Sequence, residues 1–234
     1  SLDSSAFSWN SKGRLQYDGG GCATQSGIDV SAYQNRSSSG NAIDWNAVAA
    51  DGVDFVMVRC GLRGTSTGNI LADAFYDRNI DGAMAAGLTT GVYFFSQAIT
   101  VQEAREEADY VIRQLKDHPI SGPVAYDWEM KDKTYRVYGT SPKMATDCAK
   151  AFCERIEEAG YRAMVYAGKY VGYLKFDLSE LTDYDLWYPE YKYTTSSTRS
   201  PSFYYQMDYW QYTDSLSVNG IGGKVDGNLR FLWS

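Results

Sequence analysis

The chain has 234 residues, 44% of them hydrophobic, so it is long enough for one sizeable core and fits a single barrel-type domain. A formal net charge of −7 and an isoelectric point near 4.8 disfavour nucleic acid or an anionic membrane surface as partner, because both attract faces rich in Lys and Arg. No run of about 18 apolar residues occurs, so no membrane span is predicted. A neutral or weakly charged ligand is easier to accommodate.

The four cysteines are too few for a disulfide scaffold in a chain of this size. Cys148 and Cys153 share one helical pattern, in which their Cα atoms lie roughly 8 to 9 Å apart, too far to bridge. We interpret all four as buried or tolerated thiols, with a bridge through Cys22 as the alternative. His118 is the single histidine and no CxxC pair occurs, so we expect neither a metal nor a cofactor. The 20 Tyr and 6 Trp suit a carbohydrate groove as well as a core.

Residues 1–26 are rich in Ser and Gly and lack periodicity, which predicts a linker or tail, with a short hairpin as a further option. The folded domain is predicted to span residues 27–234. We expect any export signal or anchor to lie outside this sequence, with residues 1–26 as the tether.

From residue 27 the pattern alternates between strand and helix. Predicted strands cover residues 27–33, 55–61, 89–98, 122–130 and 161–168. Predicted helices cover 42–52 and 72–87, then run from Thr100, with a capping box to Glu103, and from Ser141-Pro142 to about Gly160. This order indicates a parallel α/β sheet or barrel.

The last quarter differs, because a short helix at 169–176 is followed by strand-like runs at 185–191, 204–213 and 224–232 without room for long helices between them. The sequence therefore predicts eight strands and roughly five helices, in a barrel whose closing strands lack the outer helical layer.

Two acids occupy one face of a predicted strand, in the stretch VAYDWEMK. Period-two geometry points Asp127 and Glu129 to the same side, about 6.6 Å apart along the strand, and Tyr126 and Trp128 to the other. In a parallel barrel that side is the interior or its C-terminal mouth, where active sites gather.

Asp29 and Asp226 lie on the first and last predicted strands, which are neighbours in a closed barrel. Four carboxyls at one mouth would raise some of their pKa values, and a protonated acid beside an ionised one is what glycosidic bond cleavage requires. Each acid taken singly has a structural alternative, namely a capped strand end or an ion-pair partner.

These residues resemble glycoside hydrolase family 25, lysozymes that act as N-acetylmuramidases on bacterial peptidoglycan. The resemblance covers residues 27–232 and consists, in the family's order, of GIDVSAYQ, IDW, GVYFFS, YDWE, LWYPEY, WQYT and VDGN. It implies an α/β fold, a flattened eight-stranded TIM-like (β/α) barrel with about five helices. It also implies peptidoglycan glycan strands as the partner and an extracellular or cell-surface location, and we expect a monomer.

The resemblance implies that Glu129 is the general acid, that Asp127 is the partner carboxylate, and that Asp29 and Asp226 complete the site. Residues near strand ends that could line the sugar groove are Tyr93, Tyr126, Tyr166, Trp187 and Gln211. Core packing is the alternative for each aromatic residue, and strand alternation points Tyr126 away from the interior.

Two mechanisms stay open: Asp127 attacks carbon or activates water, or it stabilises an oxazolinium ion formed by the substrate's 2-acetamido group. The DxE spacing resembles that of substrate-assisted chitinases and favours the second. Alternatives to a muramidase are a non-catalytic module that binds cell-wall glycan and a chitinase-type hydrolase. The longer DxxDxDxE run of chitinases is absent before Glu129. Residues 35–42 form a longer connection than is usual in the family and are expected to reshape one end of the groove.

Overall fold

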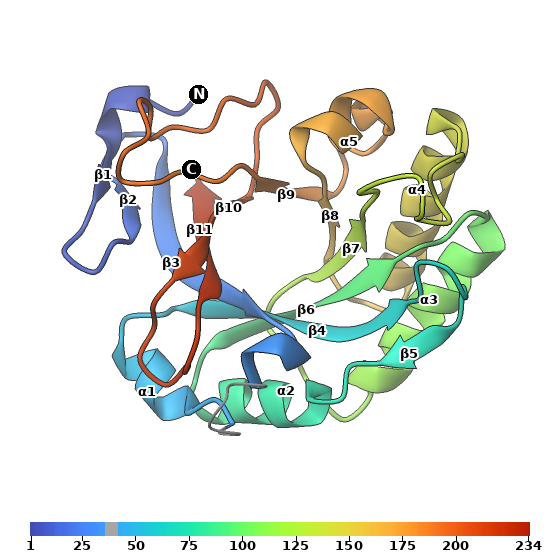
Figure 1. Ribbon diagram of the computed structural model, residues 1–234, viewed down its shortest axis with the longest axis horizontal. Coiled ribbons are helices and arrows are strands. Elements are labelled where there is room, and N and C mark those ends of the chain that lie inside the picture. The colour runs from blue at the N-terminus through green and yellow to red at the C-terminus, as the bar shows by residue number, and fades with distance from the viewer. Residues whose placement is uncertain (36–41) are drawn as a thin grey trace.

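A single sheet closes on itself to form the body of the protein (Figure 1), seen here in a computed structural model that describes residues 1–35 and 42–234. The strand order is β3-β11-β10-β9-β8-β7-β6-β4, and pairing of β3 with β4 closes the barrel. The barrel strands are β3 (Cys22–Val30), β4 (Phe55–Arg63), β6 (Thr89–Ser96), β7 (Val124–Trp128), β8 (Ala163–Tyr166), β9 (Asp185–Pro189), β10 (Tyr209–Leu216) and β11 (Val225–Trp233). The predicted eight-stranded barrel is confirmed, with β5 (Ile70–Ala72) as an extra strand on β4.

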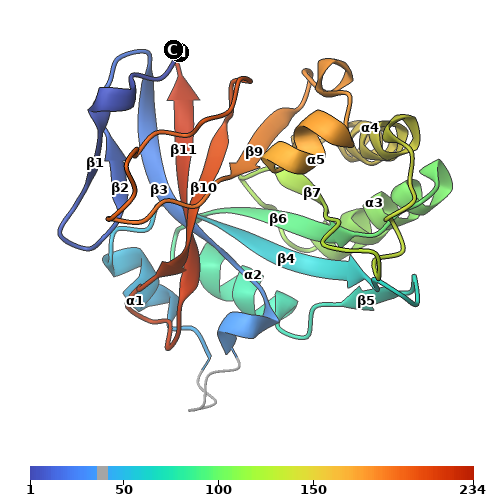
Figure 2. The same cartoon turned by 45° about the horizontal axis from the view of Figure 1, so that its top comes forward.

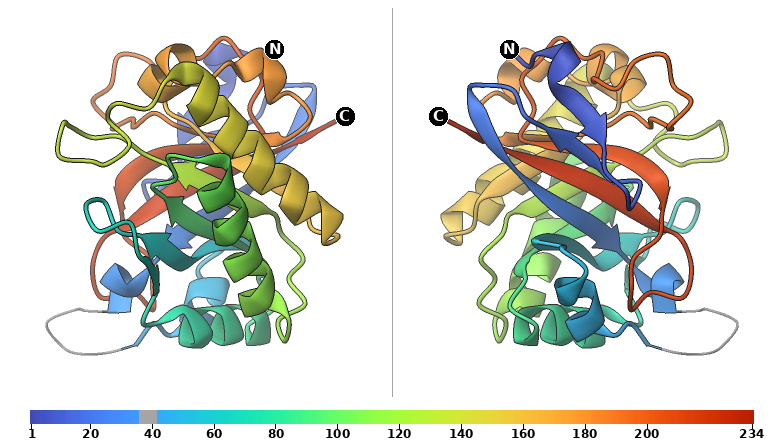
Figure 3. Two further views of the ribbon diagram at one scale, coloured as in Figure 1. Left: turned by 90° about the vertical axis from the view of Figure 1, so that its right-hand side faces the viewer. Right: turned by 90° about the vertical axis from the view of Figure 1, so that its left-hand side faces the viewer.

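Helices cover only part of the barrel (Figure 3, left), and α3 packs lengthwise against α4. The α-helices of the described residues are α1 (Trp45–Ala50), α2 (Tyr76–Ala85), α3 (Val101–Leu115), α4 (Pro142–Glu158) and α5 (Lys169–Leu174). The predicted start of α3 is correct, since Thr100 Oγ1 accepts a hydrogen bond from the Glu103 amide at 3.1 Å. Ser141 likewise caps α4 and is followed by Pro142 in the first turn.

An N-terminal hairpin takes the place of an outer helix over the closing strands (Figures 2 and 3). Its strands are β1 (Phe7–Trp9) and β2 (Leu15–Tyr17). Phe7 packs edge-on against Trp210 of β10, with ring centroids 5.6 Å apart, and Tyr17 against Phe231 of β11 at 6.3 Å. The segment before residue 27 is thus packed on the barrel, and β3 begins at Cys22 because its first residues pair with β11 as far as Trp233.

One strand runs against the others. Pairings from β3 through β4, β6, β7, β8 and β9 to β10 are parallel, whereas β11 is antiparallel to both β10 and β3. The expectation of a parallel barrel therefore fails for this strand. Residues 217–224 join β10 to β11, and so short a connection cannot return the chain for a parallel strand. The mouth consequently gathers the N-terminal end of β11 with the C-terminal ends of its neighbours.

The remaining predictions concern cysteines and membrane spans. All four cysteines are free, and Cys22 is the one that is not fully buried. Within the described part of the chain, no helix is both long and apolar enough to cross a membrane. The predicted effect of the long 35–42 connection falls mainly on residues 36–41, which lie outside the described residues.

A buried ion pair fastens the hairpin to the barrel. The Arg14 guanidinium binds both the carboxylate and the carbonyl oxygen of Asp51 at the end of α1. Lys12 Nζ lies 2.7 Å from Asp51 Oδ1, and the Asn219 amide donates to Asp51 Oδ2 at 3.0 Å. Although burial acts to raise the pKa of Asp51, hydrogen bonds from Lys12, Asn219 and Arg14 lower it to about 2. These contacts of Asp51 with Arg14, Lys12 and Asn219, called the Arg14 clasp below, join the hairpin, α1 and the β10–β11 connection.

We predict that Arg14→Met lowers the free energy of unfolding by about 3 kcal/mol, because it removes the buried guanidinium that binds the Asp51 carboxylate and carbonyl. Lys12→Met is the matched control: the Lys12 side chain is 53% exposed against 5% for Arg14, and its loss should cost less than about 1 kcal/mol. Urea unfolding measures both. Equal, small losses would show that the hairpin does not depend on this clasp.

Candidate active site

The four predicted acids converge on one cavity of about 340 Å³ at the barrel mouth. Asp127 lies in β7, and Glu129 follows directly after the strand ends at Trp128. Asp29 near the end of β3 and Asp226 at the start of β11 are direct register partners. The cavity is also lined by four of the five predicted groove residues, namely Tyr93, Tyr166, Trp187 and Gln211.

Tyr126 does not line the cavity. Its ring is fully buried on the outer face of β7 and packs against Phe152 of α4, with centroids 4.9 Å apart. The reason is strand alternation, which turns residue 126 outward when Asp127 turns inward. Tyr126 is therefore a core residue between the barrel and α4.

Asp29 and Asp226 form the first carboxyl pair. Asp29 Oδ2 accepts hydrogen bonds from Gln211 Nε2 and Asn228 Nδ2, both at 2.8 Å, and Gln211 Nε2 also lies 3.3 Å from Asp226 Oδ2. Burial raises the pKa of Asp29, opposed by hydrogen bonds from Asp226, Asn228 and Gln211. Burial and the charge of Asp29 raise the pKa of Asp226 to about 10. The pair thus holds one proton at neutral pH, with Asp226 as donor to Asp29.

Asp127 and Glu129 form the second pair, and their carboxyls interact directly through a hydrogen bond. Burial is the main cause that raises the pKa of each. The charge of Glu129 adds to the rise at Asp127, whereas at Glu129 the hydrogen bond from Asp127 opposes the rise and the charge of Asp29 adds to it. Among the described residues, Asp127 Oδ1 has no hydrogen-bond partner although it is buried.

Tyr93, Tyr166 and Trp187 form an aromatic wall of the cavity, and polar contacts at its edges hold it in place. Trp187 Nε1 donates to Asn228 Oδ1 at 2.8 Å, and the Tyr166 hydroxyl donates to Gln211 Oε1 at 2.7 Å. The Trp187 ring packs edge-on against Tyr166 at 4.9 Å and Tyr93 at 5.7 Å. Because the amides that fix the rings also bind Asp29, the wall and the first carboxyl pair form one unit.

Several residues of the site went unrecognised in the sequence. Arg59 lines the cavity, donates from Nε to Asp73 Oδ2 at 2.8 Å, and lies over the Tyr33 ring at 5.6 Å. The sequence contains a signal for Arg59, because Phe55 and Met57 point into the barrel and strand alternation puts residue 59 on the same inner face. Tyr191 lines the cavity from the end of the quoted LWYPEY stretch.

The arrangement is suited to proton transfer. Each pair sets a carboxyl that holds a proton beside one that is ionised, inside a cavity walled by rings. Across residues 1–35 and 42–234, no group of three or more His, Cys, Asp or Glu side chains is arranged to hold a metal ion. General acid catalysis with a neighbouring carboxylate is the chemistry that these groups support.

Comparison with known proteins gives a consistent picture. Residues 28–221 match the sequence profile of glycosyl hydrolases family 25. An autolytic lysozyme of Clostridium acetobutylicum is 28% identical over 201 residues, which is 86% of this chain and 54% of that protein. The modular autolysin LytC of Streptococcus pneumoniae, solved with a synthetic peptidoglycan ligand, has a similar fold with a TM-score of 0.74 at 23% identity, over 95% of this chain and 49% of that one.

A family 25 glycosyl hydrolase from Bacillus anthracis is also similar in fold, with a TM-score of 0.69 at 20% identity over 90% of this chain and 89% of that one. The chain therefore spans about half the length of the autolytic lysozyme and of LytC. It spans most of the Bacillus protein.

We predict that Asp226→Asn raises the melting temperature and flattens its fall with pH. An unfolded Asp has a pKa of about 3.9, so the folded protein binds an extra proton between that value and the raised one, and its stability falls as pH rises across this window. The Asn amide can donate to Asp29 at every pH. Melting temperatures between about pH 6 and pH 9 test this. Asp117→Asn, at an exposed position after α3, is the control; identical slopes for wild type and Asp226→Asn would contradict it.

Proposed function

The chain belongs to glycosyl hydrolase family 25, and on that premise we propose that it is a muramidase, which cleaves the β-1,4 bond between N-acetylmuramic acid and N-acetylglucosamine in bacterial peptidoglycan. The observation that carries the proposal is the convergence of four carboxyls with raised pKa values on one aromatic-walled cavity. A glycosidase needs a carboxyl that keeps its proton at neutral pH beside one that does not.

We assign Glu129 as the general acid. It is only partly buried, whereas Asp127 is 6% exposed, so Glu129 is the member of the pair that a leaving oxygen can reach. Burial raises its pKa and the nearby Asp29 charge adds to the rise, while the hydrogen bond from Asp127 opposes it; the net rise favours the protonated form that an acid catalyst needs.

Asp127 is better placed to assist the substrate than to attack it. A direct nucleophile must approach the sugar from the face opposite the acid, with about 5 Å or more between the two carboxyls. The hydrogen bond between Asp127 and Glu129 puts both groups on one side. Attack by the substrate's own acetamido oxygen, with Asp127 orienting the acetamido N–H and stabilising the resulting oxazolinium ion, fits this placement. The Asp127 carboxyl, which lines the cavity, would accept that N–H.

The other groups shape the pocket. Asp29 and Asp226, tied to Gln211 and Asn228, would offer hydrogen-bond partners to sugar hydroxyls. Tyr191 is 40% exposed and can stack on a sugar ring, whereas Trp187 is 2% exposed and supports the wall from behind. The substrate lies outside the cytoplasm, so the proposal carries an extracellular or cell-surface location with it.

Glu129→Gln should lower the rate of clearing of purified peptidoglycan by about 10²-fold or more, because the amide cannot supply the proton. The matched control is Glu158→Gln, since that side chain is 70% exposed on α4 and should leave the rate unchanged. Turbidity loss measures clearing. Equal clearing by wild type and Glu129→Gln would exclude Glu129 as the acid, and no clearing by the wild type would favour a binding module. Cleavage of chitin oligomers but not of muramic-acid glycans would point to a chitinase-type enzyme.

Activity should fall on the alkaline side as pH rises through the raised pKa of Glu129, because only the protonated form donates. The dependence of kcat/KM on pH reports this pKa in the free enzyme. A profile that stays flat to about pH 9 would contradict the assignment.

A further inference from the structure

Glu129 lies beyond the end of its strand, so the sheet does not hold it. The ladder of β7 ends at Trp128, and the Glu129 carbonyl oxygen instead accepts a hydrogen bond from Gln97 Nε2 at 2.7 Å. Gln97 follows β6, the neighbouring strand, and its side chain is fully buried. A buried side-chain amide therefore takes over the restraint that a ladder bond would give.

Gln97 is itself held from two sides. Its Nε2 also donates to the Ser96 carbonyl at 3.1 Å, which fixes the amide across its own backbone. The Gln97 main-chain carbonyl accepts from Arg136 Nη1 at 2.8 Å, whereas its side-chain Oε1 has no partner among the described residues. Arg136 also binds the Glu103 carboxylate at 2.8 and 3.0 Å. The Arg136–Glu103 ion pair joins the segment between β7 and α4 to the first turn of α3, and it also holds the backbone of Gln97.

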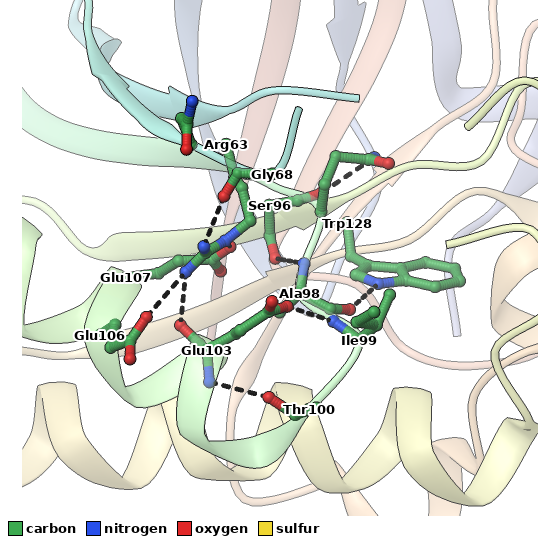
Figure 4. A network of polar contacts seen from close by, with 12 residues as sticks. Arg63, Gly68, Ser96, Ala98, Ile99, Thr100, Glu103, Glu106, Glu107 and Trp128 are labelled. Atoms are coloured by element: carbon green, nitrogen blue, oxygen red, sulfur yellow. Dashed lines mark hydrogen bonds and ion pairs between the residues drawn. The ribbon is translucent and has the colours of Figure 1, made fainter. Parts of the chain in front are cut away.

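The segment around Gln97 is tied down further along (Figure 4). Trp128 Nε1 donates to the Ala98 carbonyl at 3.2 Å, and the Ala98 amide donates to Ser96 Oγ at 3.1 Å. The Ile99 amide donates to Glu103 Oε2 at 2.9 Å, and Arg63 Nη2 donates to the Glu103 carbonyl at 3.1 Å. The turn after β6 is thus a rigid support on which the end of β7 rests.

We propose that Gln97 is a positioning residue for the acid: it sets the backbone of Glu129 so that the carboxyl projects into the cavity beside Asp127. The inference rests on the proposed function of Glu129. Gln97 does not line the cavity, so it acts on the reaction indirectly; of the residues to which it is hydrogen-bonded here, Glu129 is the one that lines the cavity. A shift of the acid by about 1 Å is enough to slow a reaction about 10²-fold without loss of substrate binding.

Gln97→Met keeps the length of the side chain and removes the donor. We expect kcat to fall between about 10- and 100-fold with KM within about twofold of the wild type. Thr146→Val is the matched control, because Thr146 is also buried and its Oγ1 donates to the Pro142 carbonyl at 2.8 Å, away from the cavity on α4. It should lower the melting temperature without lowering kcat.

Gln97→Glu supplies a conservative rescue. A buried carboxyl stays protonated above its usual pKa and can donate to the Glu129 carbonyl as the amide does, whereas the ionised form cannot. The ratio of Gln97→Glu to wild-type kcat should therefore be near one at acid pH and fall as pH rises, while the ratio for Gln97→Met stays low and constant.

Three results would overturn the proposal: a folded Gln97→Met with kcat within about twofold of the wild type, equal losses of kcat in Gln97→Met and Thr146→Val, or a Gln97→Glu ratio that does not change with pH. The last remains decisive if Gln97→Met does not fold. An active Glu129→Gln enzyme would instead refute the proposed function, so the two failures are distinct.

Discussion

The antiparallel pairing of β11 with β3 is the constraint on which the site depends. It closes the barrel and places Asp226 directly opposite Asp29. A slip of one residue in this register would turn Asp226 to the other face and separate the pair. The same strand carries Asn228, whose amide binds Asp29 and whose oxygen holds Trp187. Closure of the fold and assembly of the carboxyl site are therefore one event.

Burying four carboxyls at one mouth is unfavourable unless protons and donors compensate. Amide groups of Gln211 and Asn228 satisfy Asp29, which lets it stay ionised beside a protonated Asp226. The second pair has fewer fixed donors among the described residues, and both of its carboxyls line the cavity. The first pair is thus a fixed support, and the second is the reactive one. The free-energy cost of burying the second pair is offset by stabilising contacts elsewhere, such as the Arg14 clasp.

Features encoded locally could be predicted from the sequence. Alternating hydrophobicity located the barrel strands, capping residues located the starts of α3 and α4, and period-two geometry put Asp127 and Glu129 on one side while turning Tyr126 outward. The neighbourhood of the first and last strands followed from closure alone.

Features that depend on distant contacts could not be predicted in this way. The reversal of β11 follows from a short connection, yet its consequence for the mouth appears only in three dimensions. Gln97 meets Glu129 across neighbouring strand ends, and Arg14 meets Asp51 across the hairpin. No local pattern marks a buried amide or guanidinium as the partner of a particular distant group.

The most direct test is to follow each carboxyl of the site through its own titration. Carbon-detected NMR of protein labelled at Asp and Glu side chains, with Asp29, Asp127, Glu129 and Asp226 assigned by substitution, counts the protons that the mouth retains. Two of the four carboxyls should still be protonated at about pH 7, one from each pair. If all four ionise below about pH 5, as exposed acids do, the mouth holds no proton to donate and is not the acid site described here.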